Sequence, residues 1–207
     1  MKLLHMDSGI STESVTRSLT ASIVAHVVNK HPSVQVTYRD LIANPIPYMN
    51  LKTLPSAHPV SMPIGTLSDQ EHAYRDVTEQ ALDEFLSADV TVIGVPMYNF
   101  GVAAQLKSWF DAVVIPGKTF TYSSDGPIGL VGSKHVIAAV ARGSAYGAIG
   151  FPTSMEHAEA YIRSVFSFIG IYEPQVILAE GVAFDREAAL ERANAGISEI
   201  LPLLLSE

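Results

Sequence analysis

Cysteine is absent from the 207-residue chain. Disulfide bonds, thiolate metal sites and a cysteine nucleophile are therefore excluded. A secreted fold held together by disulfides is excluded as well, so a reducing cytoplasm is the expected location. A chain of this length buries roughly 70% of its unfolded surface without any such cross-link. We therefore expect a single domain over residues 1–207.

Basic residues are also few, because 13 Lys and Arg stand against 21 Asp and Glu for a net charge of −8. No run of five or more Lys and Arg occurs, which argues against nucleic acid or an anionic membrane surface as a partner. The longest uncharged stretch, residues 90–106, is too short and too polar to span a bilayer. The first residues, MKLLHMD, reach an acid at position 7 and do not fit a signal peptide.

Motifs for several common chemistries are missing too. None of the seven histidines lies in an HExxH or other metal-ligand spacing. The lysine of a Walker A loop and the GxGxxG fingerprint are both absent, which argues against an ATPase and a Rossmann dehydrogenase. No G-x-S-x-G elbow is present, so Ser144 has no special claim as a nucleophile. We predict no metal site and nominate no catalytic acid, base or nucleophile.

What the chain does contain is a regular alternation of strands and helices. Apolar or alternating runs predict strands at residues 2–6, 34–38, 89–96, 135–140 and 175–178. Helical periodicity and capping residues predict helices at residues 13–30, from the capping box 68–71 onward, 103–114, 154–168 and 186–205. This order is typical of an α/β, doubly wound, flavodoxin-like fold whose five-stranded parallel sheet has the order 2-1-3-4-5. Ligands of such sheets bind at the carboxyl ends of the strands.

Two segments interrupt the alternation. Residues 43–67 carry five prolines, which exclude a regular helix. A loop of that length in a compact domain is usually functional or disordered. Residues 118–130 predict a hairpin that turns at residues 123–126. In the helix that opens at the capping box, one face should be apolar: Tyr74, Val77, Ala81, Leu82 and Phe85.

Three of the strand ends carry residues suited to a ligand. Residues 7–17 are rich in hydroxyls and lead into a helix, which suits either a phosphate cradle or simple helix capping. Residues 96–101 place two aromatic side chains, a methionine and an amide where they could wall a planar ring, or belong to the core. Residues 141–147 offer glycines for close approach of a ligand, and Arg142, which could equally pair with an acid on the surface.

Taken together, these loops resemble those of the FMN-dependent NADH azoreductases, also described as NADH:quinone oxidoreductases, of the bacterial flavodoxin-like family. The resemblance covers essentially the whole chain. Its most specific blocks are RDLIANPIP at residues 39–47, PMYNF at 96–100, QLK at 105–107 followed by Asp111, and GKTF at 117–120 through GPIGL at 126–130.

The resemblance implies that FMN places its phosphate against residues 14–16 with Gly9 nearby. Its ring and ribityl chain would contact residues 97–100, and the pyrimidine edge would face residues 141–144. The implied cofactor contacts are therefore Gly9, Ser14, Val15, Thr16, Met97, Tyr98, Asn99, Phe100, Ala141, Arg142, Gly143 and Ser144. The family usually has a second Ser where this chain has Gly9, and Ser-Arg-Gly-Gly where it has Ala-Arg-Gly-Ser at 141–144.

The resemblance further implies that NADH reduces the flavin and leaves before a quinone or an azo compound takes two electrons, which is a ping-pong mechanism. Phe120, Tyr122 and Tyr146 are candidates for stacking on the substrate, or for ordinary packing. Relatives are homodimers whose substrate pocket draws on both subunits, which would give residues 43–67 and the hairpin a role. Two alternatives remain open at this point: a flavodoxin-type electron carrier that acts with protein partners, and a flavin-free scaffold.

Overall fold

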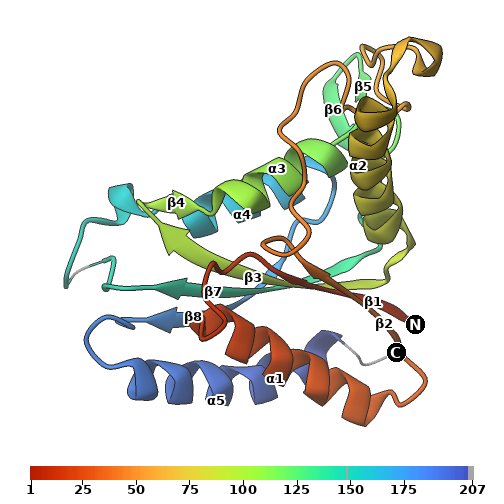
Figure 1. The fold of residues 1–207 in the computed structure, drawn as a ribbon. Helices are drawn as coiled ribbons and strands as arrows, with labels where there is room; N and C mark the ends of the chain where they lie inside the picture. Colours follow the sequence, from red (N-terminus) through yellow and green to blue (C-terminus); the bar gives the residue numbers. More distant parts are fainter. Residues whose placement is uncertain (148, 205–207) are drawn as a thin grey trace.

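Five parallel strands form the centre of the fold in the order β2-β1-β3-β7-β8 (Figure 1), in a computed structural model that describes residues 1–147 and 149–204. The strands are β1 Lys2–Asp7, β2 Gln35–Asp40, β3 Val90–Tyr98, β7 His135–Arg142 and β8 Gln175–Glu180. A short strand, β4 Gly101–Val102, pairs antiparallel with the end of β3. The flavodoxin-like order predicted from the sequence is confirmed.

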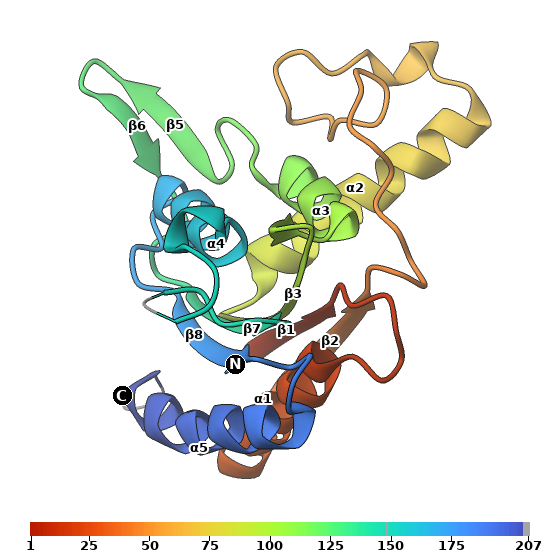
Figure 2. The same cartoon turned by 90° about the vertical axis from the view of Figure 1, so that its left-hand side faces the viewer.

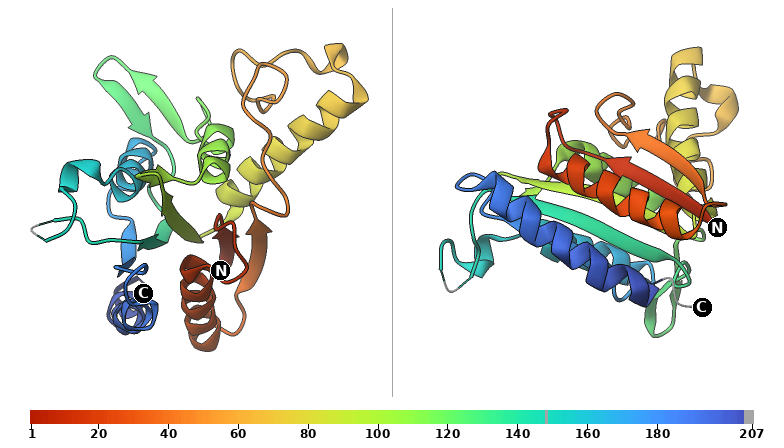
Figure 3. Two further views of the ribbon diagram at one scale, coloured as in Figure 1. Left: turned by 60° about the vertical axis from the view of Figure 1, so that its left-hand side comes forward. Right: turned by 90° about the horizontal axis from the view of Figure 1, so that it is seen from below.

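Helices cover both faces of this sheet, as Figures 1 and 3 show. One face carries α1 Val15–Lys30 and α5 Arg186–Leu204, which lie side by side (Figure 3). The other carries α2 Asp69–Ser87, α3 Ala104–Val113 and α4 Ala158–Phe168. Each layer has its own apolar core. The β-branched run that forms β3 lies between the layers and is buried from Val90 to Pro96, as expected for a central parallel strand.

Several boundaries differ from the sequence prediction, and each difference has a local cause. β3 continues through Pro96 to Tyr98 because β4 folds back and pairs with its last two residues. β7 continues to Arg142 because β8 pairs with it over the same length. The fourth predicted helix begins at Ala158, since Thr153–Met155 forms a separate 3-10 turn. α1 begins at Val15.

The capping box at the start of α2 is confirmed, because Ser68 and Glu71 bond reciprocally to each other's main-chain N–H. The expected apolar face of this helix is only partly right. Tyr74 is exposed, whereas Arg75 is 2% exposed and turns inward. Its guanidinium donates hydrogen bonds to three carbonyl oxygens, of Leu51, Lys52 and Met62. The proline-rich segment is therefore an ordered loop fastened to α2.

Two projections rise from the face that carries α2, α3 and α4 (Figure 2). One is the loop of residues 43–67, which includes a 3-10 turn at Ile64–Thr66. The other is the predicted hairpin, formed by β5 Phe120–Ser123 and β6 Gly126–Gly129. Across the described residues, none of the helices combines the length and the apolar character needed to cross a membrane. The same part of the chain holds no cluster of potential metal ligands.

Candidate functional site

The three loops singled out in the sequence follow neighbouring strands of the sheet. β1, β3 and β7 are adjacent and parallel, so their carboxyl ends meet at one edge (Figure 1). The register places Pro96 directly beside Ala141. The structure thus brings the ends of the three strands together, as the fold class predicts.

The loop after β1 gathers two hydroxyl groups at the start of α1. The Ser14 and Thr16 hydroxyl oxygens lie 2.9 Å apart and share a hydrogen bond. Ser14 occupies the N-cap position, but its side chain caps no main-chain N–H of the helix. A Cβ atom on Gly9 would lie 2.5 Å from the Ser14 hydroxyl oxygen and 3.3 Å from that of Thr16. The loop main chain therefore rests directly against both hydroxyls, and capping does not account for Ser14.

Val15, between these two residues, has a different position. Its side chain is buried and packs in the core beneath α1. Any contribution of Val15 to ligand binding must come from its main chain. At the amino end of a helix the first main-chain N–H groups have no partner within the helix and carry partial positive charge. The two hydroxyls and these N–H groups form a small site that has no charged side chain of its own and suits a phosphate.

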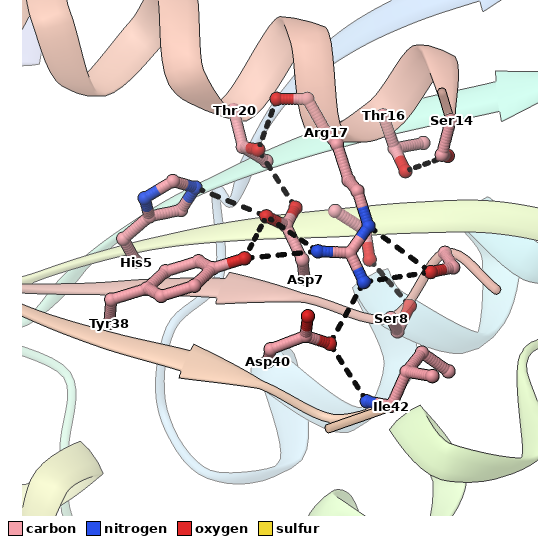
Figure 4. A network of polar contacts seen from close by, with 12 residues as sticks. His5, Asp7, Ser8, Ser14, Thr16, Arg17, Thr20, Tyr38, Asp40 and Ile42 are labelled. Carbon is pink, nitrogen blue, oxygen red and sulfur yellow. Dashed lines mark hydrogen bonds and ion pairs between the residues drawn. The ribbon is translucent and has the colours of Figure 1, made fainter. Parts of the chain in front are cut away.

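A polar network centred on the buried Asp7 lies beneath this loop (Figure 4). Asp7, which is 2% exposed, accepts hydrogen bonds from Thr20 at 2.8 Å and from Tyr38 at 3.1 Å. Arg17 lies 3.7 Å from the same carboxylate and donates to Asp40 at 2.8 Å. The sequence analysis did not single out Arg17, Tyr38 or Asp40. Only their places at the start of α1 and the end of β2, next to β1, could have indicated them.

This network shifts the titration of its members. The hydrogen bond from Arg17 is the main reason that the pKa of Asp40 is lowered, and the same contact raises the pKa of Arg17. Burial raises the pKa of Tyr38, and the nearby Asp7 carboxylate adds to the effect. Burial lowers the pKa of His5, which Asp7 partly opposes. The site thus has a fixed ion pair, and the Arg17 charge is balanced within the protein.

The loop after β3 is a tight turn in an unusual conformation. Met97 pairs with Val102, and Tyr98 pairs with Gly101, so Asn99 and Phe100 form a two-residue connection. Both have positive φ angles, 48° and 72°. Such angles favour glycine, and two successive non-glycine residues in this region store strain of the kind found at ligand sites. The Tyr98 hydroxyl accepts a hydrogen bond from the Ile10 N–H at 3.2 Å, which joins this turn to the hydroxyl-rich loop.

The loop after β7 is anchored by Arg142. Its Nε lies 2.9 Å from a carboxylate oxygen of Glu180, a second carboxylate, on Glu156, lies 3.8 Å away, and its guanidinium carbon is 5.4 Å from the Tyr146 ring centre. Arg142 thus pairs with an acid, but as a buried residue rather than on the surface, and its role toward a ligand stays a prediction. Ala141 is nearly buried within β7, and Gly143 and Ser144 begin the loop.

An aromatic group connects the last two loops. Tyr146 stacks on Phe151 with ring centres 5.6 Å apart, and Phe151 meets Phe100 edge to face at 6.5 Å. Tyr146 is thus connected through Phe151 to the turn after β3, and its role in stacking on a substrate stays a prediction. Phe151 was missed, because it follows a glycine-rich stretch with no periodic pattern.

The other two aromatic candidates lie elsewhere within the chain. The hairpin follows the far end of α3 and projects away from the sheet, beyond the helix layer (Figure 1). Phe120 is buried and packs on Phe168 at 4.6 Å, whereas Tyr122 is 71% exposed. One chain alone does not bring Phe120 and Tyr122 to the strand-end loops.

A mostly apolar cavity of about 810 Å³ lies beside the β3–β4 turn. Tyr98 and Asn99 form one wall, and residues of α3 and α4, among them Gln105 and Tyr161, form the others. Its size and lining are in the range of small-molecule sites.

Comparison with known proteins shows what this arrangement is similar to. A family model described as a flavodoxin-like fold matches residues 1–201. An FMN-dependent NADH:quinone oxidoreductase of Methylobacterium radiotolerans is 47% identical over 204 residues, which cover 97% of this chain and 99% of that protein. Azoreductase AzrA superposes with a TM-score of 0.83 at 27% identity over 99% of both chains. An FMN-dependent NADH-azoreductase of Bacillus anthracis, crystallised in complex with FMN, has the same fold, with a TM-score of 0.85 at 24% identity over 99% of both chains.

Proposed function

Because the chain belongs to the flavodoxin-like family that contains the FMN-dependent NADH:quinone oxidoreductases, we propose that it is such an enzyme. It transfers two electrons from NADH through bound FMN to quinones and aromatic azo compounds, in a ping-pong mechanism. The family membership supports the reaction class, and the azoreductases of the same fold support the azo substrates.

The observation that carries the cofactor assignment is the pair of hydroxyls at the start of α1. Ser14 has no capping role, meets Thr16 at 2.9 Å, and lies against the main chain of Gly9. These donors can bind a phosphate group through hydrogen bonds, without a charged side chain of the protein. In the proposal, residues 14–16 with Gly9 hold the phosphate, residues 97–100 contact the ring and ribityl chain, and residues 141–144 line the polar edge of the ring.

When bound, FMN would supply the redox chemistry, a two-electron transfer between NADH and the acceptor. The role of the chain is to bind the flavin and to orient it. The turn at Asn99 and Phe100 presents a fixed surface, and the loop after β7 offers main-chain N–H donors that Gly143 leaves uncovered. Arg142 contributes by holding its loop through Glu180. The proposal requires no protein acid or base.

The proposal includes a homodimer located in the cytoplasm. In a dimer, the hairpin of a second copy would bring Tyr122 to the strand-end loops that it does not reach in its own chain, whereas Phe120, which is buried against Phe168, would serve only to hold the hairpin. The large exposure of Tyr122 supports this role. Exposed apolar side chains on the proline-rich loop, among them Tyr48 and Met49, offer further surface for the same contact.

The test is NADH oxidation by the purified protein, with benzoquinone as acceptor and no other protein present. The expected result is a yellow protein that oxidises NADH only when the quinone is added. A matched control is Thr16→Asp, whose carboxylate repels the phosphate and should release FMN. A yellow protein that neither reacts with NADH nor reduces the quinone would identify a flavodoxin-type carrier instead. A colourless protein that FMN cannot reconstitute would show a flavin-free scaffold.

A further inference from the structure

One peptide unit of the loop after β1 is held from both sides. The carbonyl oxygen of Gly9 accepts hydrogen bonds from Arg17 Nε at 3.2 Å and Arg17 Nη2 at 3.0 Å. The N–H of Ile10, which belongs to the same peptide unit, donates to the Tyr98 hydroxyl at 3.2 Å. The plane of this peptide is therefore fixed by a side chain of α1 and a side chain of β3.

Arg17 is fully engaged by groups of the protein itself (Figure 4). Besides the Gly9 carbonyl, its Nη1 donates to the Tyr38 hydroxyl at 3.0 Å and its Nη2 to Asp40 at 2.8 Å. The Asp7 carboxylate lies 3.7 Å from Nη1. Four hydrogen bonds thus join the guanidinium to Gly9, Tyr38 and Asp40, and Asp7 is its ion-pair neighbour. Arg17 can reach a ligand only by giving up these contacts, so it acts on the ligand site through Gly9.

The orientation of the Gly9–Ile10 peptide matters because of what lies beside it. A Cβ atom on Gly9 would lie 2.5 Å from the Ser14 hydroxyl oxygen and 3.3 Å from that of Thr16, so the Gly9 main chain lies close to the place where the phosphate is proposed to bind. Because Gly9 has no side chain, this peptide can rotate with little steric resistance. A rotated peptide would turn its carbonyl oxygen toward a bound anion and repel it. The two hydrogen bonds from Arg17 hold that oxygen on the guanidinium and so oppose the rotation.

We propose that Arg17 is a positioning residue that gives the flavin site its preference for a phosphorylated flavin over riboflavin. The inference rests on the proposed function, since it assumes that FMN is the cofactor. The preference then depends on the forked guanidinium of Arg17, which donates hydrogen bonds to the Gly9 carbonyl oxygen and to the Asp40 carboxylate at the same time. A lysine at this position keeps the charge but cannot hold both acceptors in one plane.

The experiment compares FMN with riboflavin on the full-length protein after its flavin has been removed by dialysis. Flavin fluorescence quenching gives the dissociation constant of each flavin for the wild type, Arg17→Lys, Arg17→Met and the control Arg163→Lys. Arg163 makes a similar carboxylate pair, with Glu159, but on the surface of α4. In Arg17→Lys, FMN affinity should fall about tenfold, as expected when hydrogen bonds to a charged group are lost, with riboflavin affinity within about twofold of the wild type. Arg163→Lys should match the wild type for both flavins.

Three results would overturn the inference. Equal losses of FMN and riboflavin affinity would show that Arg17 only stabilises the fold. Unchanged affinity for both flavins would show that the Gly9–Ile10 peptide needs no support from Arg17. A preference for FMN that is fully kept in Arg17→Lys but lost in Arg17→Met would show that the preference depends on charge alone. A wild type that binds neither flavin would instead contradict the proposed function itself, so the two failures are distinguishable.

Discussion

The main-chain N–H of His157 donates a hydrogen bond to the carbonyl oxygen of Phe100, at 2.9 Å. This contact joins the start of α4 to the strained β3–β4 turn. The neighbouring Glu156 carboxylate accepts the N–H groups of Ala158 and Glu159, and lies 3.8 Å from Arg142. The turn after β3 and the loop after β7 are therefore supported by the same short segment before α4. The segment helps to explain how two consecutive residues can keep positive φ angles.

The strain at Phe100 predicts that glycine is more stable than alanine at this position, which is the reverse of the usual order. Phe100→Ala and Phe100→Gly both remove the aromatic ring, so they differ mainly in the cost of a φ angle of 72°. Phe100→Gly should be the more stable of the two by about 1 kcal/mol, because only glycine adopts this conformation freely. Urea unfolding of both variants measures the difference in the free energy of unfolding.

The same pair of substitutions at Ile128 in β6 is the control. Ile128 is exposed and does not have a positive φ angle. There the ordinary order should hold, with alanine more stable than glycine in a strand by roughly 0.5 to 1 kcal/mol. If alanine were also the more stable residue at position 100, the turn would not be strained.

The order of the sheet and the existence of the three loops could be predicted, because strand patterns such as residues 89–96 and the alternation of elements are local properties of the sequence. The network beneath the first loop could not, because Arg17 lies on α1 whereas Tyr38 and Asp40 lie on β2, and only the folded chain brings the two elements together. For the same reason the inward position of Arg75 was missed: its partners are main-chain carbonyls, which leave no mark in the sequence. The role of Arg142 was left open because pairing with Glu180 depends on the register of β7 and β8.

Gly9 and Ser14 should be energetically coupled. A Cβ atom on residue 9 would lie 2.5 Å from the Ser14 hydroxyl oxygen and 2.7 Å from its Cβ, so Gly9→Ala must displace the Ser14 side chain. In a Ser14→Gly background the two closest contacts are gone and only the Thr16 hydroxyl oxygen remains, at 3.3 Å, while an N-cap glycine costs only a few tenths of a kcal/mol. A double-mutant cycle on the free energy of unfolding should therefore give an interaction energy of roughly 1 kcal/mol. Additive effects would mean that the loop moves away from Ser14 at no cost.

His5 should make the fold less stable in mild acid. Burial lowers its pKa below the ordinary value of 6.5, with Asp7 opposing the shift and Arg17 adding to it. The unfolded chain therefore takes up a proton on His5 at a higher pH than the folded chain does. Stability from this group is complete above pH 6.5 and is lost as the pH falls toward the lower folded pKa.

Urea unfolding at pH 7.5 and at pH 5.5 tests this contribution. His5→Phe keeps an aromatic ring next to Tyr38, whose ring centre lies 4.8 Å away, but has no titrating group. The variant should lose less stability than the wild type between the two pH values. Equal losses in the two proteins would show that other groups carry the pH dependence.

Mixed dimers test whether the hairpin of one chain completes the site of the other. Thr16→Asp should lose FMN but keep an intact hairpin, and Tyr122→Ser should keep FMN but lose the exposed aromatic ring. Each variant alone should have little quinone reductase activity. Random exchange of subunits at equal concentrations gives half mixed dimers, each with one intact site, so activity should recover to about a quarter of the wild-type value per chain.

The NADH–benzoquinone assay before and after exchange measures the recovery, and native mass spectrometry verifies that mixed dimers are present. Recovery is possible only if Tyr122 acts across the interface, since neither chain holds both groups. Confirmed mixed dimers without recovery would therefore place the function of Tyr122 within its own chain.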